Sequence, residues 1–226
     1  YMDNYNYHKG MNGIIQELTG LLKTKNIGTD SDQALLLDFQ ATLETKPEKA
    51  IKLEKDALAQ IETITADNAR LVSNLHANLG GLYRMNAHPD LAREHMEKSI
   101  SLLDQFNLLH INDSIPQIAN YAMFLTEQQE PERGISELQK LSGIIKEYHS
   151  DDCLDYAKVQ ETLGTIYLMT ANLPQAKTHF KRAFKIYEKI WADEPEMIEA
   201  KYQEIQELYP QIGFCIGKNL SGLLTK

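Results

Sequence analysis

A pattern that repeats every 42 residues constrains this chain of 226 residues more than any other feature of the sequence. Gly80 and Gly164 each follow a leucine, and they lie 84 positions apart, which is twice 42. Three prolines keep the same step of 42: Pro47, Pro89 and Pro131. A fixed period of about 20 to 50 residues is typical of solenoids, in which successive units bury their apolar faces on one another. The sequence therefore predicts a stack of repeated units.

Each repeated unit has the apolar spacing of two helices. Around Gly80, the side chains of Leu75, Leu79 and Tyr83 follow one helical face. A second helix begins at Pro89, because a proline costs little in the first turn of a helix, where its missing N–H would have no partner. We expect one solenoid over 1–226, with a partial repeat at 5–25, a degenerate repeat at 31–66, repeats at 67–108, 109–150 and 151–192, a capping helix at 195–208 and a tail at 209–226.

Small residues recur where the two helices of a unit are expected to cross closely. Only glycine or alanine fits at such a contact, and a bulky side chain then fills the next space at the density of a protein interior. In the degenerate repeat, Asp38 stands where the other units have glycine or alanine. The positions that we assign to this packing are Gly80, Tyr83, Ala92, Ala122, Gly134, Gly164, Tyr167 and Ala176.

These positions resemble the tetratricopeptide repeat, whose pattern requires leucine, glycine, tyrosine, alanine and phenylalanine at set offsets. The resemblance covers about 160 residues, from Ser31 to Trp191. Its long period is similar to that of kinesin light chains and of bacterial regulators whose repeats sense peptides. The resemblance implies an all-α, right-handed superhelical solenoid of antiparallel helix pairs, with a concave groove lined by the first helix of each repeat. The unit that matches best has Leu163, Gly164, Tyr167, Ala176, Phe180 and Ala183.

The resemblance also implies where a peptide would bind. In long-repeat relatives, asparagines on the first helix bond the backbone of an extended peptide, and the matching positions here are Asn78, Asn120 and Thr162. An amide suits this role because it offers both a donor and an acceptor to a peptide bond. Local capping or a solvated polar face is the alternative interpretation of these residues. Neighbours expected on the same face are Asn74, Arg84, Met123, Lys158 and Thr165.

The neighbouring residues have an ordinary alternative too. Arg84 and Lys158 can meet a carboxylate of a ligand, or they are simple surface charges. Met123 can offer an adaptable apolar lining, or it fills the core. The family's clamp for a chaperone's terminal carboxylate is not present as a set, because Ala77 and Gly81 occupy two of its positions.

Composition limits the classes of partner. The 23 basic and 32 acidic residues give a net charge of −9, which disfavours nucleic acid as a direct ligand. We expect no membrane span, because no run of about 18 apolar residues occurs. Cys153 and Cys215 stand far apart, which is typical of free thiols in a reducing compartment, so we expect a cytoplasmic protein.

Catalytic patterns are weak, and we expect neither an enzyme nor a cofactor. His149 and Cys153 have helical spacing for two metal ligands, but no second pair completes a site, so we expect no metal. A hydrolase would need a polar cluster, for which Gln203, Glu204 and Glu207 are the only candidates, and a simple acidic cap is the favoured explanation of these three.

The function that the sequence favours is a scaffold that binds a protein or peptide. A second copy of the chain, docking through the end helices, is a further expected partner. The alternative is a peptide-sensing segment of a larger bacterial regulator that carries a DNA-binding, nucleotide-binding or catalytic domain elsewhere. The half-repeat before residue 31 and the apolar tail after Pro210 favour that alternative.

Overall fold

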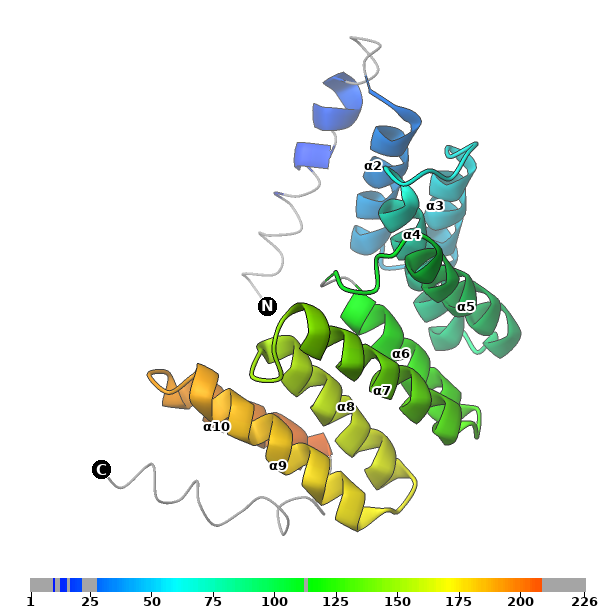
Figure 1. Ribbon diagram of the computed structural model, residues 1–226. Helices are drawn as coiled ribbons and strands as arrows, with labels where there is room; N and C mark the ends of the chain where they lie inside the picture. The colour runs from blue at the N-terminus through cyan, green and yellow to red at the C-terminus, as the bar shows by residue number, and fades with distance from the viewer. Residues whose placement is uncertain (1–9, 11–12, 16, 22–27, 112–113, 209–226) are drawn as a thin grey trace. The chain divides into compact units, whose positions relative to one another are not determined.

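A computed structural model describes residues 10, 13–15, 17–21, 28–111 and 114–208, and every regular element in these ranges is a helix (Figure 1). The predicted all-α, helical-repeat architecture is confirmed. The tail at 209–226, with Cys215, lies outside the described residues, as does most of the predicted partial repeat at 5–25. The longer helices are α2 (Asp30–Leu43), α3 (Pro47–Ala59), α4 (Ala69–Met85), α5 (Pro89–Gln105), α6 (Ser114–Glu127), α7 (Pro131–Tyr148), α8 (Leu154–Met169), α9 (Leu173–Ile190) and α10 (Pro195–Leu208).

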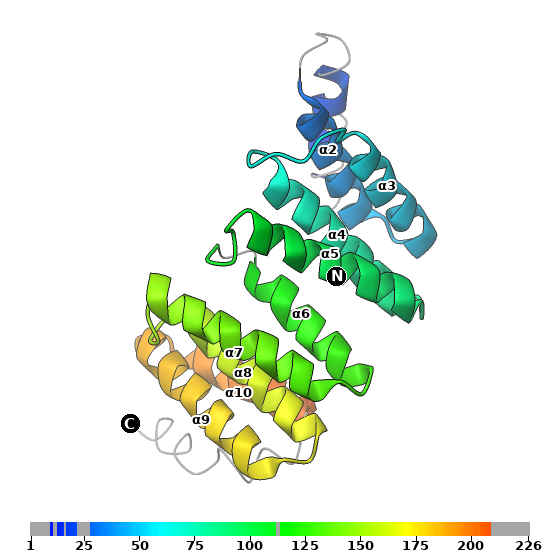
Figure 2. The same cartoon turned by 45° about the vertical axis from the view of Figure 1, so that its right-hand side comes forward.

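The chain divides into two compact units, Tyr1–Leu108 and Leu109–Lys226. In the N-terminal unit, consecutive helices from α2 to α5 pack on one another, and α2 also contacts α4. In the C-terminal unit, the same holds from α6 to α9, with α6 also against α8 and α10 against α9 (Figures 1 and 2). Each unit therefore contains two helix pairs whose first helices are neighbours. The predicted single solenoid over 1–226 and its repeat boundaries stay a prediction.

The second helix of each of the first three pairs begins at a proline of the 42-residue series, since α3, α5 and α7 start at Pro47, Pro89 and Pro131. The fixed φ of proline is already helical, and the first-turn N–H that proline lacks would have no partner inside the helix. In α9 the proline is the second residue, Pro174. The sequence pattern therefore marks the helix starts through a property of the backbone.

The turn inside three of the pairs is the same left-handed cap. Ala87, Gln129 and Ala171 have φ values of 56°, 64° and 59°, and they lie 42 residues apart. In each case the next N–H reaches back to a carbonyl five residues earlier, at 2.7–2.9 Å, in the manner of a Schellman motif. The α2–α3 pair departs from this pattern, because its C-cap residue Glu44 is extended, with ψ of 131°.

Close packing of the helices explains why glycine recurs. A Cβ placed on Gly134 would lie 2.6 Å from the backbone oxygen of Ala122, a distance that no side-chain motion relieves. On Gly80 it would lie 2.6 Å from Met96 Cγ, and on Gly164 it would lie 2.9 Å from the Phe180 ring. Gly80 and Gly164 are therefore the small halves of large-against-small contacts, and Gly134 allows a close approach of two backbones.

Candidate functional site

The first helices of the C-terminal unit, α6 and α8, carry five of the predicted peptide-binding residues. Asn120 is exposed and Met123 is half-buried, three residues apart on α6. Lys158, Thr162 and Thr165 follow one face of α8, at steps of four and three residues. Because α6 and α8 are in contact, these residues line neighbouring helices. We call them the C-terminal face: Asn120, Met123, Lys158, Thr162 and Thr165.

The side chains of the C-terminal face differ in how far they are already engaged. Asn120 makes no side-chain hydrogen bond within the described part of the chain. The Thr162 hydroxyl donates to the backbone oxygen of Lys158 at 3.0 Å, so it already has an acceptor. Lys158 Nζ lies 3.6 Å from Asp155 Oδ1, and a long ion pair with an exposed lysine is worth little. The amide of Asn120 and the charge of Lys158 therefore remain available to a ligand.

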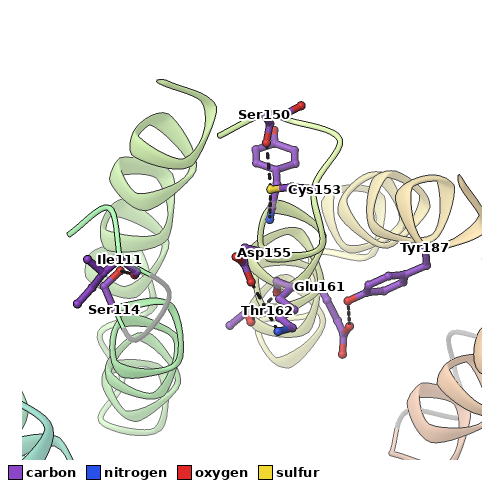
Figure 3. Close-up of polar contacts among 10 residues, drawn as sticks. Ile111, Ser114, Ser150, Cys153, Asp155, Glu161, Thr162 and Tyr187 are labelled. Atoms are coloured by element: carbon purple, nitrogen blue, oxygen red, sulfur yellow. Dashed lines mark hydrogen bonds and ion pairs between the residues drawn. The ribbon is translucent and has the colours of Figure 1, made fainter. Parts of the chain in front are cut away.

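A polar link holds the last helix of the C-terminal unit in place. The hydroxyl of Tyr187 on α9 donates to Glu161 Oε2 at 2.6 Å, as Figure 3 shows. The other oxygen of Glu161 lies 2.9 Å from Lys201 Nζ on α10. Burial, followed by the charge of Glu161, raises the pKa of Tyr187, so the tyrosine stays protonated and continues to donate. Glu161 thus joins α8 to both α9 and α10.

In the N-terminal unit, α4 carries Asn74, Asn78 and Arg84, and the structure gives Asn78 a partner that the sequence did not predict. Its amide nitrogen donates to Asp38 Oδ1 at 2.8 Å and to Glu54 Oε1 at 3.2 Å. Asn74 and Arg84 are half-buried, whereas Asn78 is exposed. Asn78, the residue expected to bind a peptide in the N-terminal unit, therefore already donates to two carboxyl groups, one from α2 and one from α3.

The two carboxyl groups occupy a core contact of the repeat. Asp38 lies 42 residues before Gly80, and Glu54 lies 42 residues before Met96, which is the side chain that packs on Gly80. Glu54 is only 2% exposed. Where the next pair packs a methionine on a glycine, this pair sets one acid against another. The sequence showed that Asp38 departs from the small residues of the other units. Glu54 could have been found in the same way, by comparing it with Met96 at the step of 42 residues.

The electrostatics of the acidic pair follow from this placement. Burial and the neighbouring Asp38 charge raise the pKa of Glu54 to about 9, and burial also raises the pKa of Asp38. Two adjacent carboxyl groups in a poorly solvated place cannot both ionise without a large cost. At neutral pH the pair therefore keeps one proton, on Glu54, which lets that carboxyl donate to Asp38.

A second polar cluster lies between α4 and α5. His76 Nδ1 and His95 Nδ1 are 2.9 Å apart, and the His95 ring stacks on Tyr83 at 5.4 Å between centroids. Burial, then the charges of His95 and Lys98, lowers the pKa of His76 to about 4, so the histidine pair is uncharged at neutral pH. Both rings line a pocket of about 320 Å³, whose other residues are Leu58, Ile61, Ile64, Val72, Glu94 and Lys98.

The structure tests the weaker chemical patterns as well. In the part of the chain that is described, no group of three histidine, cysteine or acidic residues has the geometry of a metal site. Cys153 caps α8 by accepting the N–H of Tyr156 at 3.4 Å, and His149 Nε2 lies 3.1 Å from the His110 carbonyl. Among the described helices, none combines the length and hydropathy needed to cross a bilayer.

Comparison with known proteins gives one sequence match and several structural ones. Residues 114–189 match the sequence profile of the family described as tetratricopeptide repeat. A comparison with curated proteins finds no significant match. BtubC (BKLC) from P. vanneervenii has a similar structure, with a TM-score of 0.67 and 19% identity, over 80% of this chain and 72% of that chain.

Two other solved structures share the fold. A putative kinesin light chain from Podosopora anserina, with nearly identical TPR-like repeats, has a TM-score of 0.62 and 15% identity, over 82% of this chain and 92% of that chain. MamA has a TM-score of 0.54 and 15% identity, over 83% of this chain and 94% of that chain. At such identities the likeness shows that the helices are arranged in the same fold.

Proposed function

Because this chain carries tetratricopeptide repeats, a fold that generally serves as a protein-interaction scaffold, we propose that it binds an extended segment of a partner protein along the first helices of its repeats. The observation that carries the proposal is the state of Asn120. This amide is exposed at the register that the family uses for peptide backbones, and no neighbour among the described residues occupies it.

The chemistry of the C-terminal face suits a peptide backbone and one acidic group. The Asn120 amide can donate to a peptide carbonyl and accept from a peptide N–H at the same time. Lys158 supplies an exposed positive charge, and its ion pair with Asp155 is long, at 3.6 Å. Met123 adds an adaptable apolar surface beside them. The helices are held by their own packing, so the partner segment bears most of the ordering cost.

The experiment that tests this function is selection from a displayed library of random peptides with the whole chain as bait. We expect wild type to select peptides, and Asn120→Ala to weaken those that bind the C-terminal unit by about tenfold, which is what the loss of one well-placed hydrogen bond to a desolvated group gives. Gln139→Ala is the matched control, because Gln139 is an exposed amide on α7, the second helix of the same pair.

Two outcomes would contradict the proposed function. If wild type selects no peptide above background, the chain is not a peptide-binding scaffold. If Asn120→Ala and Gln139→Ala have equal effects on every selected peptide, binding does not use the first helices. Circular dichroism of both variants checks that helicity is unchanged, so that a loss of binding reports on the face itself.

Asn78 gives a separate reading of the N-terminal unit. Asn78→Ala removes an amide that is already bonded to Asp38 and Glu54, so we expect it to change the carboxyl pair as well as any ligand contact. The double variant Asn78→Ala/Asn120→Ala should keep its helicity and weaken the capture of peptides that bind at either asparagine. Retained capture would remove both asparagines from the proposal.

A further inference from the structure

Among the described residues, no positive charge accompanies the acidic pair Asp38 and Glu54. The groups that shift the pKa values of Asp38 and Glu54 are burial, the two carboxyls themselves and the amide of Asn78, with no lysine, arginine or histidine among them. Glu54 is 2% exposed, and its buried Oε2 atom accepts no hydrogen bond from a donor in the described structure. A buried acid with an unpartnered oxygen costs free energy, unless a proton or a cation compensates it.

The geometry leaves one side of the pair open. Glu54 lies in the interior, Asp38 is half-buried, and Asn78, which bonds both, is exposed on α4. Asp38 Oδ1 accepts from Asn78, and Asp38 is the more exposed of the two acids. Since α2 and α4 are the neighbouring first helices of this unit, a ligand that lies along them would meet Asp38 directly.

We propose that Asp38, Glu54 and Asn78 form a site for one cationic side chain of the partner, the ammonium of a lysine or the guanidinium of an arginine. This inference rests on the proposed function, because it names the residue that the bound segment places on the N-terminal unit. Asp38 makes the contact, Glu54 sets the charge behind it, and Asn78 fixes the Asp38 carboxyl in place.

The cation replaces a proton. In the free chain the O–H group of Glu54 donates to Asp38, and the pair carries one negative charge. When an ammonium binds Asp38, the O–H bond of Glu54 breaks, the proton passes to water or buffer, and the pair then carries two negative charges beside one positive charge. The ammonium keeps its own protons. Binding near neutral pH is therefore coupled to the release of one proton per site.

The repeat itself supplies the matched variant. Asp38→Ala/Glu54→Met introduces the residue types found at the equivalent registers of other pairs, Ala122 and Met96. Alanine keeps only the Cβ that Asp38 already has, and methionine has fewer side-chain heavy atoms than glutamate, so the variant removes both carboxyls without overfilling the helix pair. The isosteric Asp38→Asn/Glu54→Gln is a second variant with the same loss of charge. Glu48→Met/Asp104→Ala removes the same number of carboxyl groups from exposed positions on α3 and α5 and serves as the control.

The test is the same peptide library, read for the position of basic residues. We expect peptides selected by wild type to carry lysine or arginine at one fixed position, enriched about tenfold, and both site variants to lose this enrichment while they still select peptides. The surface control should keep it. With one selected peptide, calorimetry in two buffers of different ionisation enthalpy should show the released proton in wild type alone.

The outcomes separate this inference from the proposed function. If no bait selects any peptide, the proposed function fails and the cation site fails with it. If peptides are selected without a fixed basic residue, or if the site variants keep the preference, only the cation site is wrong. If calcium or magnesium ions alone raise the melting temperature of wild type and leave Asp38→Ala/Glu54→Met unchanged, the pair holds a metal ion and the inference is overturned.

Discussion

The α2–α3 and α8–α9 pairs place chemically different residues at the same contact between their two helices, acidic in the first pair and apolar in the second. Gly164 and Phe180 meet in the second pair, where the ring covers the glycine, and three periods of 42 earlier the same registers hold Asp38 and Glu54. An aromatic ring on a glycine packs equally well at any pH. A pair of carboxyls packs only while it keeps a proton or gains a cation. The repeat register thus sets which residues meet, and their chemistry sets what the contact responds to.

The turns of these two pairs differ in the same way. The α8 helix ends in a left-handed residue, Ala171, with the N–H of Asn172 bonded to Tyr167 O at 2.7 Å. The α2 helix ends in the extended residue Glu44. The first pair therefore departs from the repeat at its core contact and at its turn together, and it is the pair whose stability should depend most on conditions.

The largest expected effect comes from making the first pair resemble the others. Asp38→Ala/Glu54→Met should increase the free energy of unfolding by about 3 kcal/mol at pH 7. The sign follows from Glu54, whose folded pKa of about 9 lies above its ordinary value of 4.5, so stability present at low pH is lost as pH rises between these values. Urea unfolding of wild type and variant at several pH values between 4.5 and about 9 measures this difference in the free energy of unfolding. A wild type whose stability does not fall over that range would break the comparison.

The next effect runs in the opposite direction with pH. His76 has a folded pKa of about 4 against an ordinary value of 6.5, so its contribution is present above 6.5 and is lost as pH falls towards 4. His76→Gln introduces the residue found at position 160, where Gln160 Oε1 lies 2.9 Å from His179 Nδ1. We expect this variant to recover about 2 kcal/mol near pH 4.5, allowing for partial exposure. NMR titration of the histidines in wild type, with His76→Gln used to assign the His76 signal, measures the pKa. A His76 pKa at its ordinary value would contradict this account.

Glycine replacements sharpen the packing side of the comparison. Gly164→Ala should lower the free energy of unfolding by about 1–2 kcal/mol, because the Phe180 ring stands where the new Cβ would lie. Gly80→Ala should cost less, since Met96 can rotate away. Gly81→Ala is the control, with nothing within 4 Å of its Cβ, and it should stabilise the helix by up to about 1 kcal/mol. Equal effects of all three in thermal unfolding would mean that these contacts are not close-packed.

The smallest expected effect concerns the turn. Ala171→Gly should stabilise the C-terminal unit by about 0.5–1 kcal/mol, because alanine at φ of 59° carries a steric cost that glycine does not. Ala157→Gly, inside α8, should instead destabilise it through lost helix propensity and packing. Differential scanning calorimetry of both variants gives the two signs, and a loss of stability in Ala171→Gly would show that the turn is unstrained.

The sequence predicted the likeness to tetratricopeptide repeats, which the profile match over residues 114–189 bears out, and the all-α helical repeat, because both depend on the spacing of backbone-determining and packing residues. Proline positions predicted where α3, α5 and α7 begin. Only half of the acidic pair was noted from the sequence: Asp38 departs from the glycine or alanine of the other units, whereas Glu54 was not singled out. The bond from Asn78 to both acids escaped prediction, since it depends on how three helices bring side chains together.

The histidine cluster was missed for a related reason. His76 and His95 are 19 residues apart, a spacing that belongs neither to one helix face nor to the repeat. Only the packing of α4 on α5 brings their Nδ1 atoms to 2.9 Å from each other. The equivalent residues Gln160 and His179 keep the same contact with a different chemistry. A repeat alignment reveals such pairs once the structure has shown which registers face each other.

The left-handed turns have a consequence for how such a chain can grow. In these caps a backbone hydrogen bond joins residues five apart, so the turn cannot accommodate an extra residue. An insertion there would shift the second helix and disrupt its close contact with the first. The connection between α3 and α4, from 60 to 68, has no such closure and is mostly exposed. Insertions, reporter tags and new loops should therefore be accepted between α3 and α4 and rejected at the three turns that Ala87, Gln129 and Ala171 close.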